Sequence, residues 1–154
     1  MPAPSGAVRL RRATDRDVGA IVALWRACGL VMPWNDPYAD IARCRQQRQA
    51  ALFVATAGGA LAGTVMAGDD GHRGWLYYVA VDPSRRRQGL GRLLVAHAEG
   101  WLRGRGVPKA ELLVRAANRE ATGFYAALGY EKKPRVVMDR WLTEPPARKE
   151  PSKP

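Results

Sequence analysis

Residues 79–92 read Val-Ala-Val-Asp-Pro-Ser-Arg-Arg-Arg-Gln-Gly-Leu-Gly-Arg, a run that joins a strand-like segment to a basic turn and the start of a helix. Val79 to Val81 favour a strand, and Asp82-Pro83 ends it. Glycines at 89 and 91 let the backbone approach a ligand closely, and unpaired N–H groups at a helix start attract anions. The turn therefore predicts a phosphate or pyrophosphate site. An ordinary turn with solvated arginines is the alternative.

Hydrophobic periodicity outward from this turn predicts a mixed α/β protein. Strand, helix and strand follow one another around the turn, and this order requires a crossover, so the strands at 75–81 and 111–115 should be parallel. The further expected strands are 8–12, 51–56, 60–68 and one or two within 130–141. The expected helices are 18–28, 37–48, 89–103 and 118–128.

Length and composition fit one globular domain, expected over residues 1–142, followed by a mobile, proline-rich tail at 143–154. The chain has 154 residues, of which 47% are hydrophobic, and neither a membrane-length apolar run nor a signal-like start is present, so a cytoplasmic location is expected. Cys28 and Cys44 fit buried apolar positions and do not form a CxxC metal or redox motif. The 25 basic against 14 acidic residues give a charge of +11, which fits an anionic ligand, nucleic acid or an acidic substrate.

Two motifs together carry a resemblance to a known family. The Rossmann pattern would need a glycine at Leu94, and GxxxxGK[ST] is absent. However, Arg86-Arg87-Gln88-Gly89-Leu90-Gly91 resembles the R/Q-x-x-G-x-G/A acetyl-CoA signature of the GNAT (GCN5-related) N-acetyltransferases. The preceding VAVDP and the later Asn118, Phe124-Tyr125 and Leu128-Gly129-Tyr130 resemble the same family over about residues 7–141. Within it, Pro33–Pro37 and Asp70–Gly74 resemble a bacterial YpeA-type subgroup.

The resemblance implies a mixed sheet of about six or seven strands with about four helices, splayed between the strands at 75–81 and 111–115. It implies acetyl-CoA as co-substrate, with no metal. The implied cofactor contacts are the backbone of Val79, Ala80 and Val81, the turn residues Arg86, Arg87, Gln88, Gly89, Leu90, Gly91 and Arg92, and Asn118. Asn118 also suits the first position of a helix as its cap.

Amine acetylation needs a base that makes the amine neutral and an acid that protonates the leaving thiolate. The resemblance implies that Tyr125 is the general acid, with core packing as its alternative role. Many relatives carry a glutamate where Leu113 stands, so the base is open between Glu111, His72, nearby Asp69 or Asp70, and a water. Trp34, Asp36 and Asp70 are candidates for binding the acceptor, although Asp36 equally suits a helix cap.

Three functions stay open at this point. The first is an N-acetyltransferase that transfers the acetyl group directly to a primary amine of a small molecule or peptide. The second is an acyl-CoA sensor without catalysis, and the third is a basic domain that binds a ribosome or nucleic acid, for which no RNA-binding motif is visible. No membrane partner is expected, and the sequence leaves a second copy of the chain open as a partner.

Overall fold

The computed structural model describes residues 6–144 and divides the chain into two compact units, one up to Leu112 and one from Leu113 onward. Residues 143 and 144 form no helix or strand, and the rest of the predicted tail lies outside the described residues. In the described part of the chain, no helix is long and apolar enough to cross a membrane. The single domain over 1–142 stays a prediction.

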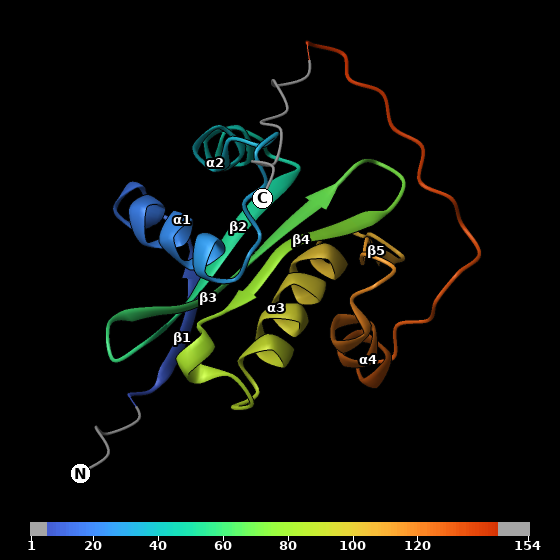
Figure 1. Ribbon diagram of the computed structural model, residues 1–154. Helices are drawn as coiled ribbons and strands as arrows, with labels where there is room; N and C mark the ends of the chain where they lie inside the picture. Colours follow the sequence, from blue (N-terminus) through green and yellow to red (C-terminus); the bar gives the residue numbers. More distant parts are fainter. Residues whose placement is uncertain (1–5, 145–154) are drawn as a thin grey trace, which may run out of the picture. The chain divides into compact units, whose positions relative to one another are not determined.

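The first unit contains a mixed sheet with the strand order β1-β2-β3-β4-β5 (Figure 1). Neighbouring strands from β1 to β4 are antiparallel, and β4 and β5 are parallel, as the crossover predicted. The strands are β1 Val8–Arg12, β2 Ala50–Ala57, β3 Ala60–Asp69, β4 Gly74–Val81 and β5 Ala110–Leu112. The helices of this unit are α1 Val18–Ala27, α2 Pro37–Arg45 and α3 Leu90–Gly104, with short 3-10 turns η1 Asp15–Asp17 and η2 Pro83–Arg85.

Local signals explain where the first helices begin. Asp17 accepts hydrogen bonds from the backbone and hydroxyl of Thr14 at 2.7 and 3.0 Å, which forms a capping box before α1. Asp36 accepts from the backbone N–H of Tyr38 at 2.9 Å, and Pro37 stands in the first turn of α2. The capping alternative for Asp36 is therefore confirmed.

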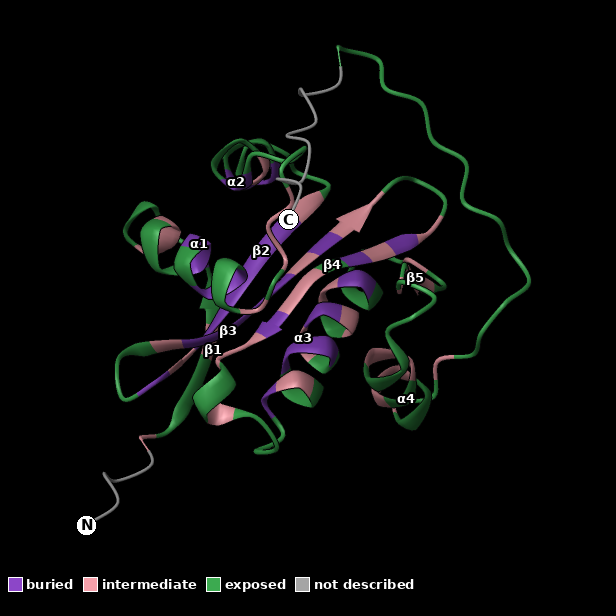
Figure 2. Cartoon of the chain, in the orientation of Figure 1, coloured by how far each residue is buried: buried purple, intermediate pink, exposed green. Residues whose placement is uncertain are grey.

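The helices cover both faces of the sheet (Figure 1). On one face, α1 and α2 bury Ile21, Trp25 and Ile41 against residues of β2 and β4. On the other, α3 packs so closely that a Cβ on Gly74 would lie 2.7 Å from a methyl carbon of Leu102. Figure 2 shows the buried residues concentrated in the central strands and the sheet-facing side of α3.

Strand β4 has two irregular features that matter for the site. Its parallel ladder with β5 covers only Gly74 to Leu76, so the strand continues to Val81 without β5 beside it. The register with β3 also shifts between Thr64 and Met66, and Tyr78 has a φ of +50°. These values define a β-bulge in β4.

Some sequence predictions need correction. The sheet has five strands within residues 6–144 instead of six or seven, because the segment 130–141 pairs with no strand there. Val136 and Met138, which would face a core in a strand, are 87% and 90% exposed. Strand β5 ends at Leu112, three residues early, and α2 ends at Arg45, because the chain then turns toward β2.

The second unit contains α4, Arg119–Ala127, which Asn118 caps by accepting from the backbone N–H of Ala121 at 3.0 Å. With α4 the described chain has the four helices that the sequence predicted. The mixed α/β fold class is likewise confirmed.

Candidate active site

The turn between β4 and α3 presents a row of backbone N–H groups. Arg87 and Gly89 have φ values of +63° and +78°, which bend the chain into the helix. The first helical hydrogen bond of α3 runs from Leu93 to the Gly89 carbonyl. The amides of Gly89, Leu90, Gly91 and Arg92 precede this bond and have no acceptor inside α3.

This turn fits the pyrophosphate of a coenzyme A molecule. Several converging N–H groups and the positive end of α3 attract an anion. Arg86, Arg87 and Arg92 are exposed around the same turn and add positive charge. Gly89 also has a left-handed φ, a conformation that glycine adopts without strain.

The edge of β4 beyond Leu76 is a second candidate binding element. Val79 to Val81 lie on this edge, in the part of the strand that β5 does not cover. An unpaired strand edge binds an extended amide-containing chain by backbone hydrogen bonds. The pantetheine arm of coenzyme A is such a chain, so the edge and the turn together fit one coenzyme A molecule.

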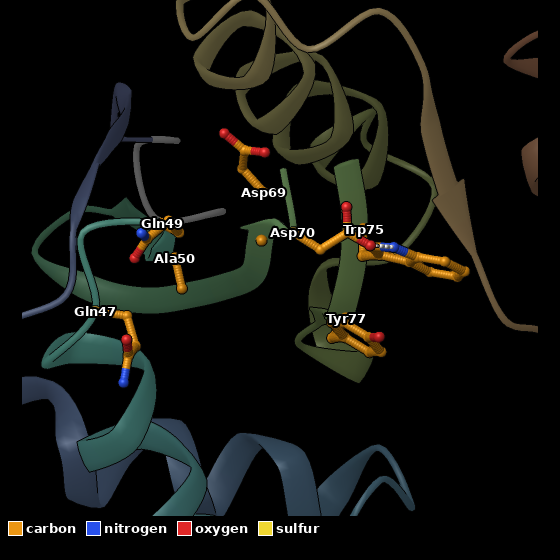
Figure 3. Close-up of a pocket in the computed structure, with 8 residues that line it drawn as sticks. Gln47, Gln49, Ala50, Asp69, Asp70, Trp75 and Tyr77 are labelled. Carbon is orange, nitrogen blue, oxygen red and sulfur yellow. Dashed lines mark hydrogen bonds between the residues drawn. The ribbon is translucent and has the colours of Figure 1, made fainter. Parts of the chain in front are cut away.

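A pocket of about 250 Å³ opens near the beginning of β4 (Figure 3). Ala50 and Gly68, which are directly opposite one another in β2 and β3, form a floor of small residues. Since Ala50 packs with the cluster around Trp25, the pocket lies on the sheet face that carries α1 and α2. The other lining residues are Gln47, Gln49, Asp69, Asp70, Trp75 and Tyr77.

Aromatic rings and carboxylates give this pocket its chemical character. The Trp75 indole N–H donates to Asp70 at 2.9 Å, as Figure 3 shows, and the rings of Trp75 and Tyr77 lie 6.5 Å apart. Backbone hydrogen bonds from Arg73 and His72 lower the pKa of Asp70. Burial raises the pKa of Tyr77, and the Asp70 charge raises it further. The pocket thus holds a carboxylate and a neutral phenol at neutral pH.

The residues of the first unit that were predicted to act as base or to bind the acceptor do not all lie at the pocket. Glu111 pairs with Trp75 in the parallel register and so shares its face, while its carboxylate lies 3.7 Å from the Lys109 ammonium. His72 is exposed in the turn between β3 and β4. Of the three predicted acceptor residues, Asp70 lines the pocket, whereas the half-exposed Trp34 and the helix cap Asp36 do not.

Tyr125 belongs to the second unit and is partly buried within an aromatic cluster. Its ring centroid lies 4.9 Å from that of Phe124 and 5.7 Å from that of Tyr130. Burial raises the pKa of its phenol to about 12. The hydroxyl therefore carries its proton at neutral pH.

Four residues that line the pocket were not predicted from the sequence: Trp75, Tyr77, Gln47 and Gln49. Trp75 and Tyr77 are two residues apart in a strand, which places both on one face. That spacing was a usable signal. Gln47 and Gln49 had no comparable signal, because their position depends on where α2 ends.

Comparisons with known proteins identify the family of this chain. Residues 11–130 match the model of the acetyltransferase (GNAT) family. An acetyltransferase of Pectobacterium atrosepticum is 39% identical over 128 residues, which are 83% of this chain and 91% of that protein. One from Yersinia enterocolitica is 36% identical over 135 residues, 88% of this chain and 96% of that protein.

Solved structures share the fold at lower identity. The aminoglycoside N-acetyltransferase AAC(6')-Iy in complex with CoA has a TM-score of 0.78 and 22% identity, over 93% of this chain and 99% of that one. A transcriptional regulator from Bacillus halodurans has a TM-score of 0.72 and 21% identity, over 88% of this chain and 100% of that one.

The chain therefore belongs to the GNAT family of acetyltransferases. It is an acetyl-CoA-dependent N-acetyltransferase, which confirms the family and the co-substrate expected from the glycine-containing turn. The narrower YpeA-type subgroup stays a prediction. No group of three or more histidine, cysteine, aspartate or glutamate side chains among residues 6–144 could hold a metal ion.

Proposed function

We propose that this chain acetylates a primary amine of a small cationic molecule, which binds in the pocket formed around Asp70, Trp75 and Tyr77. The charge contrast carries this proposal. The chain has a net charge of +11, yet the pocket lining that the structure describes contains two aspartates and two aromatic rings and no lysine or arginine. Carboxylates and aromatic faces are the groups that attract an ammonium ion.

The position of the pocket on β4 supports the same proposal. Tyr77 follows the last residue of β4 that pairs with β5, and the proposed pantetheine edge begins two residues later. Four residues of a strand span about 13 Å, so one strand connects the acceptor pocket to the beginning of the pyrophosphate turn. A donor and an acceptor bound in this way would meet where the sheet opens. Solved relatives with this fold include aminoglycoside acetyltransferases.

The chain's own groups supply the acid–base steps of this proposal. Bound acetyl-CoA supplies an activated acetyl thioester. Glu111 or His72, directly or through water, removes a proton from the ammonium group, and N–H groups of Val79 to Val81 polarise the carbonyl. The C–N bond forms as the C–S bond breaks, and the nitrogen then loses its second proton to water. The leaving thiolate takes up a proton, a role that the family resemblance assigns to the Tyr125 phenol, which solvent reprotonates.

The cysteines support a direct transfer. Burial raises the pKa of the Cys44 thiol to about 11, so it is not a thiolate at neutral pH. The Cys28 thiol donates to the Val81 carbonyl at 3.4 Å. Neither arrangement provides an activated nucleophile for an acetyl-cysteine intermediate.

The test compares two exposed tyrosines. Tyr77 in the pocket is 44% exposed, and Tyr38 on α2 is 49% exposed and does not line the pocket. With a panel of polyamines, amino sugars and aminoglycosides as acceptors, Tyr77→Ala should raise the KM of the best amine about tenfold, because an ammonium contact with a ring is removed. Its KM for acetyl-CoA should not change, and Tyr38→Ala should match the wild type.

Equal effects of the two substitutions would contradict the acceptor pocket. Tight CoA binding without turnover of any amine in the panel would favour a sensor. Salt-sensitive RNA binding that persists at saturating acetyl-CoA would favour a nucleic-acid role.

A further inference from the structure

A buried chain of hydrogen bonds ends at the bulge in β4. The Trp25 indole N–H donates to the Thr64 hydroxyl at 2.9 Å, and that hydroxyl donates to the Tyr78 carbonyl at 2.8 Å. Thr64 is the only polar side chain in the buried class among residues 6–144, and neither it nor Trp25 has any exposed surface. A buried hydroxyl in an otherwise apolar core indicates a specific requirement at this point.

The bulge explains this requirement. Tyr78 has a φ of +50°, and the register shift leaves its carbonyl outside the regular ladder with β3. The Thr64 hydroxyl, which is fully buried, provides a hydrogen-bond partner for this carbonyl. The Tyr78 ring also stacks on Trp25, with centroids 3.7 Å apart.

A second contact holds the bulge from the side of α2. The Tyr78 hydroxyl donates to the Asp40 carboxylate at 2.6 Å. Burial raises the pKa of Tyr78, and the bond to Asp40 raises it further, so the phenol keeps this proton throughout the physiological range. The bulge is therefore fixed at its carbonyl and at its side chain.

The consequence for binding follows from strand geometry. Successive residues of a strand direct their backbone N–H and C=O groups alternately to the two neighbouring sides, and one extra residue reverses that alternation. The bulge at Tyr78 thus decides which groups of Val79 to Val81 face the free edge.

We propose that Trp25, Thr64 and Asp40 are positioning residues that hold the β4 bulge in the form that binds coenzyme A. This inference rests on the proposed coenzyme A contact of Val79 to Val81. None of the three residues needs to touch the ligand. Their effect passes through the backbone of Tyr78.

The experiment measures CoA binding by isothermal titration calorimetry, together with the melting temperature. Thr64→Val keeps the shape of the side chain but removes the hydroxyl. It should weaken CoA binding about tenfold, in the range expected when the Tyr78 carbonyl and the buried Trp25 indole N–H lose their shared partner. Thr64→Ser restores the hydroxyl and should bind CoA as the wild type does. Val54→Ala is the matched control, because Val54 lies directly opposite Thr64 and is equally buried.

Val54→Ala should lower the melting temperature without weakening CoA binding.

The hydrogen bond between the Tyr78 hydroxyl and Asp40 is tested with Tyr78→Phe, which should weaken CoA binding about threefold. Tyr38→Phe is its control and should not weaken CoA binding. Thr64→Val binding within twofold of wild type overturns the inference, as does an equal loss in Val54→Ala. If Thr64→Val cannot be purified, Tyr78→Phe at wild-type affinity overturns it. A wild-type chain that does not bind CoA would contradict the proposed function as well.

Discussion

At the scale of single residues, Tyr125 carries the most specific chemical prediction. Burial raises the pKa of its phenol to about 12, so the phenol holds its proton at neutral pH, and transfer to a thiolate requires the thiolate to form beside it. Tyr125→Phe keeps the ring and its contacts with Phe124 and Tyr130. It should therefore lower kcat by about 10²–10⁴-fold, the range for general acid catalysis, with little effect on CoA affinity. Steady-state turnover with the best amine measures this. A kcat within a few-fold of wild type would assign Tyr125 to packing.

Asp17 carries a prediction about stability and pH. Its carboxylate accepts two bonds from Arg11, at 2.7 and 2.9 Å, and closes the capping box with Thr14. These hydrogen bonds, the Arg11 bond above all, hold the pKa of Asp17 well below its usual range. A lowered folded-state pKa gives stability that is present above the unfolded value, about 3.9, and is lost as the pH falls below it.

Asp17→Asn should therefore destabilise the protein by about 1 kcal/mol at pH 7, since the amide keeps an acceptor but loses the charge. The difference should shrink at pH 3. Thermal unfolding of both proteins at the two pH values measures the change. A difference that is the same at both pH values would mean that the ion pair contributes nothing.

At the scale of elements, the sequence correctly predicted the helices and turns whose hydrophobic periodicity and end signals point to the same boundaries. Helix α1 begins after the Thr14 capping box and is followed by Gly29, whose φ is +69°. The turn between β2 and β3 lies at Gly58-Gly59, with φ values of +59° and +80°. Sequence and structure agree here because residues close in the chain determine these features.

Elements that depend on distant partners were predicted less well. Val136 and Met138 belong to an apolar, β-branched-rich run, yet a strand forms only where another edge accepts its hydrogen bonds. The same reason limits β5 to three residues. The turn proposed for coenzyme A could be located from the sequence because its glycines and arginines are contiguous. The pocket could not, because it combines the segment after α2 with three strands.

Gly89 precedes α3 and caps its start, so a substitution there tests the proposed role of this helix end. Gly89→Glu would place a carboxylate beside amides that fit a phosphate, in a left-handed position that disfavours a side chain. It should reduce CoA affinity by at least about 100-fold, while the far-ultraviolet circular dichroism of the fold stays the same. Calorimetric titration with CoA measures the loss, and Gly100→Glu on an exposed part of α3 is the control. Unchanged affinity would remove the turn from the site.

At the scale of the whole molecule, the charge distribution should act differently on coenzyme A and on the proposed cationic amine. The net charge of +11 attracts the anionic coenzyme A and repels a cationic amine at long range. Asp69 and Asp70 act in the opposite sense at the pocket, although Arg105 lies 3.2 Å from Asp69 and partly neutralises it. A basic chain can therefore accept a cationic substrate only through a local acidic region.

Salt dependence tests this separation. Ions screen charges over about 10 Å at 0.1 M and about 3 Å at 1 M, so added salt weakens the long-range field most. Between 50 and 500 mM NaCl, the Kd of CoA should rise about tenfold because attraction from the basic chain is screened. The KM of the cationic amine should change less than about threefold, because screening removes repulsion by the chain and attraction by the pocket together. Titrations of CoA and steady-state kinetics of the amine at both salt concentrations measure the two responses. A CoA affinity that is independent of salt would mean that the backbone amides of the turn, and not the surrounding arginines, dominate recognition of the pyrophosphate.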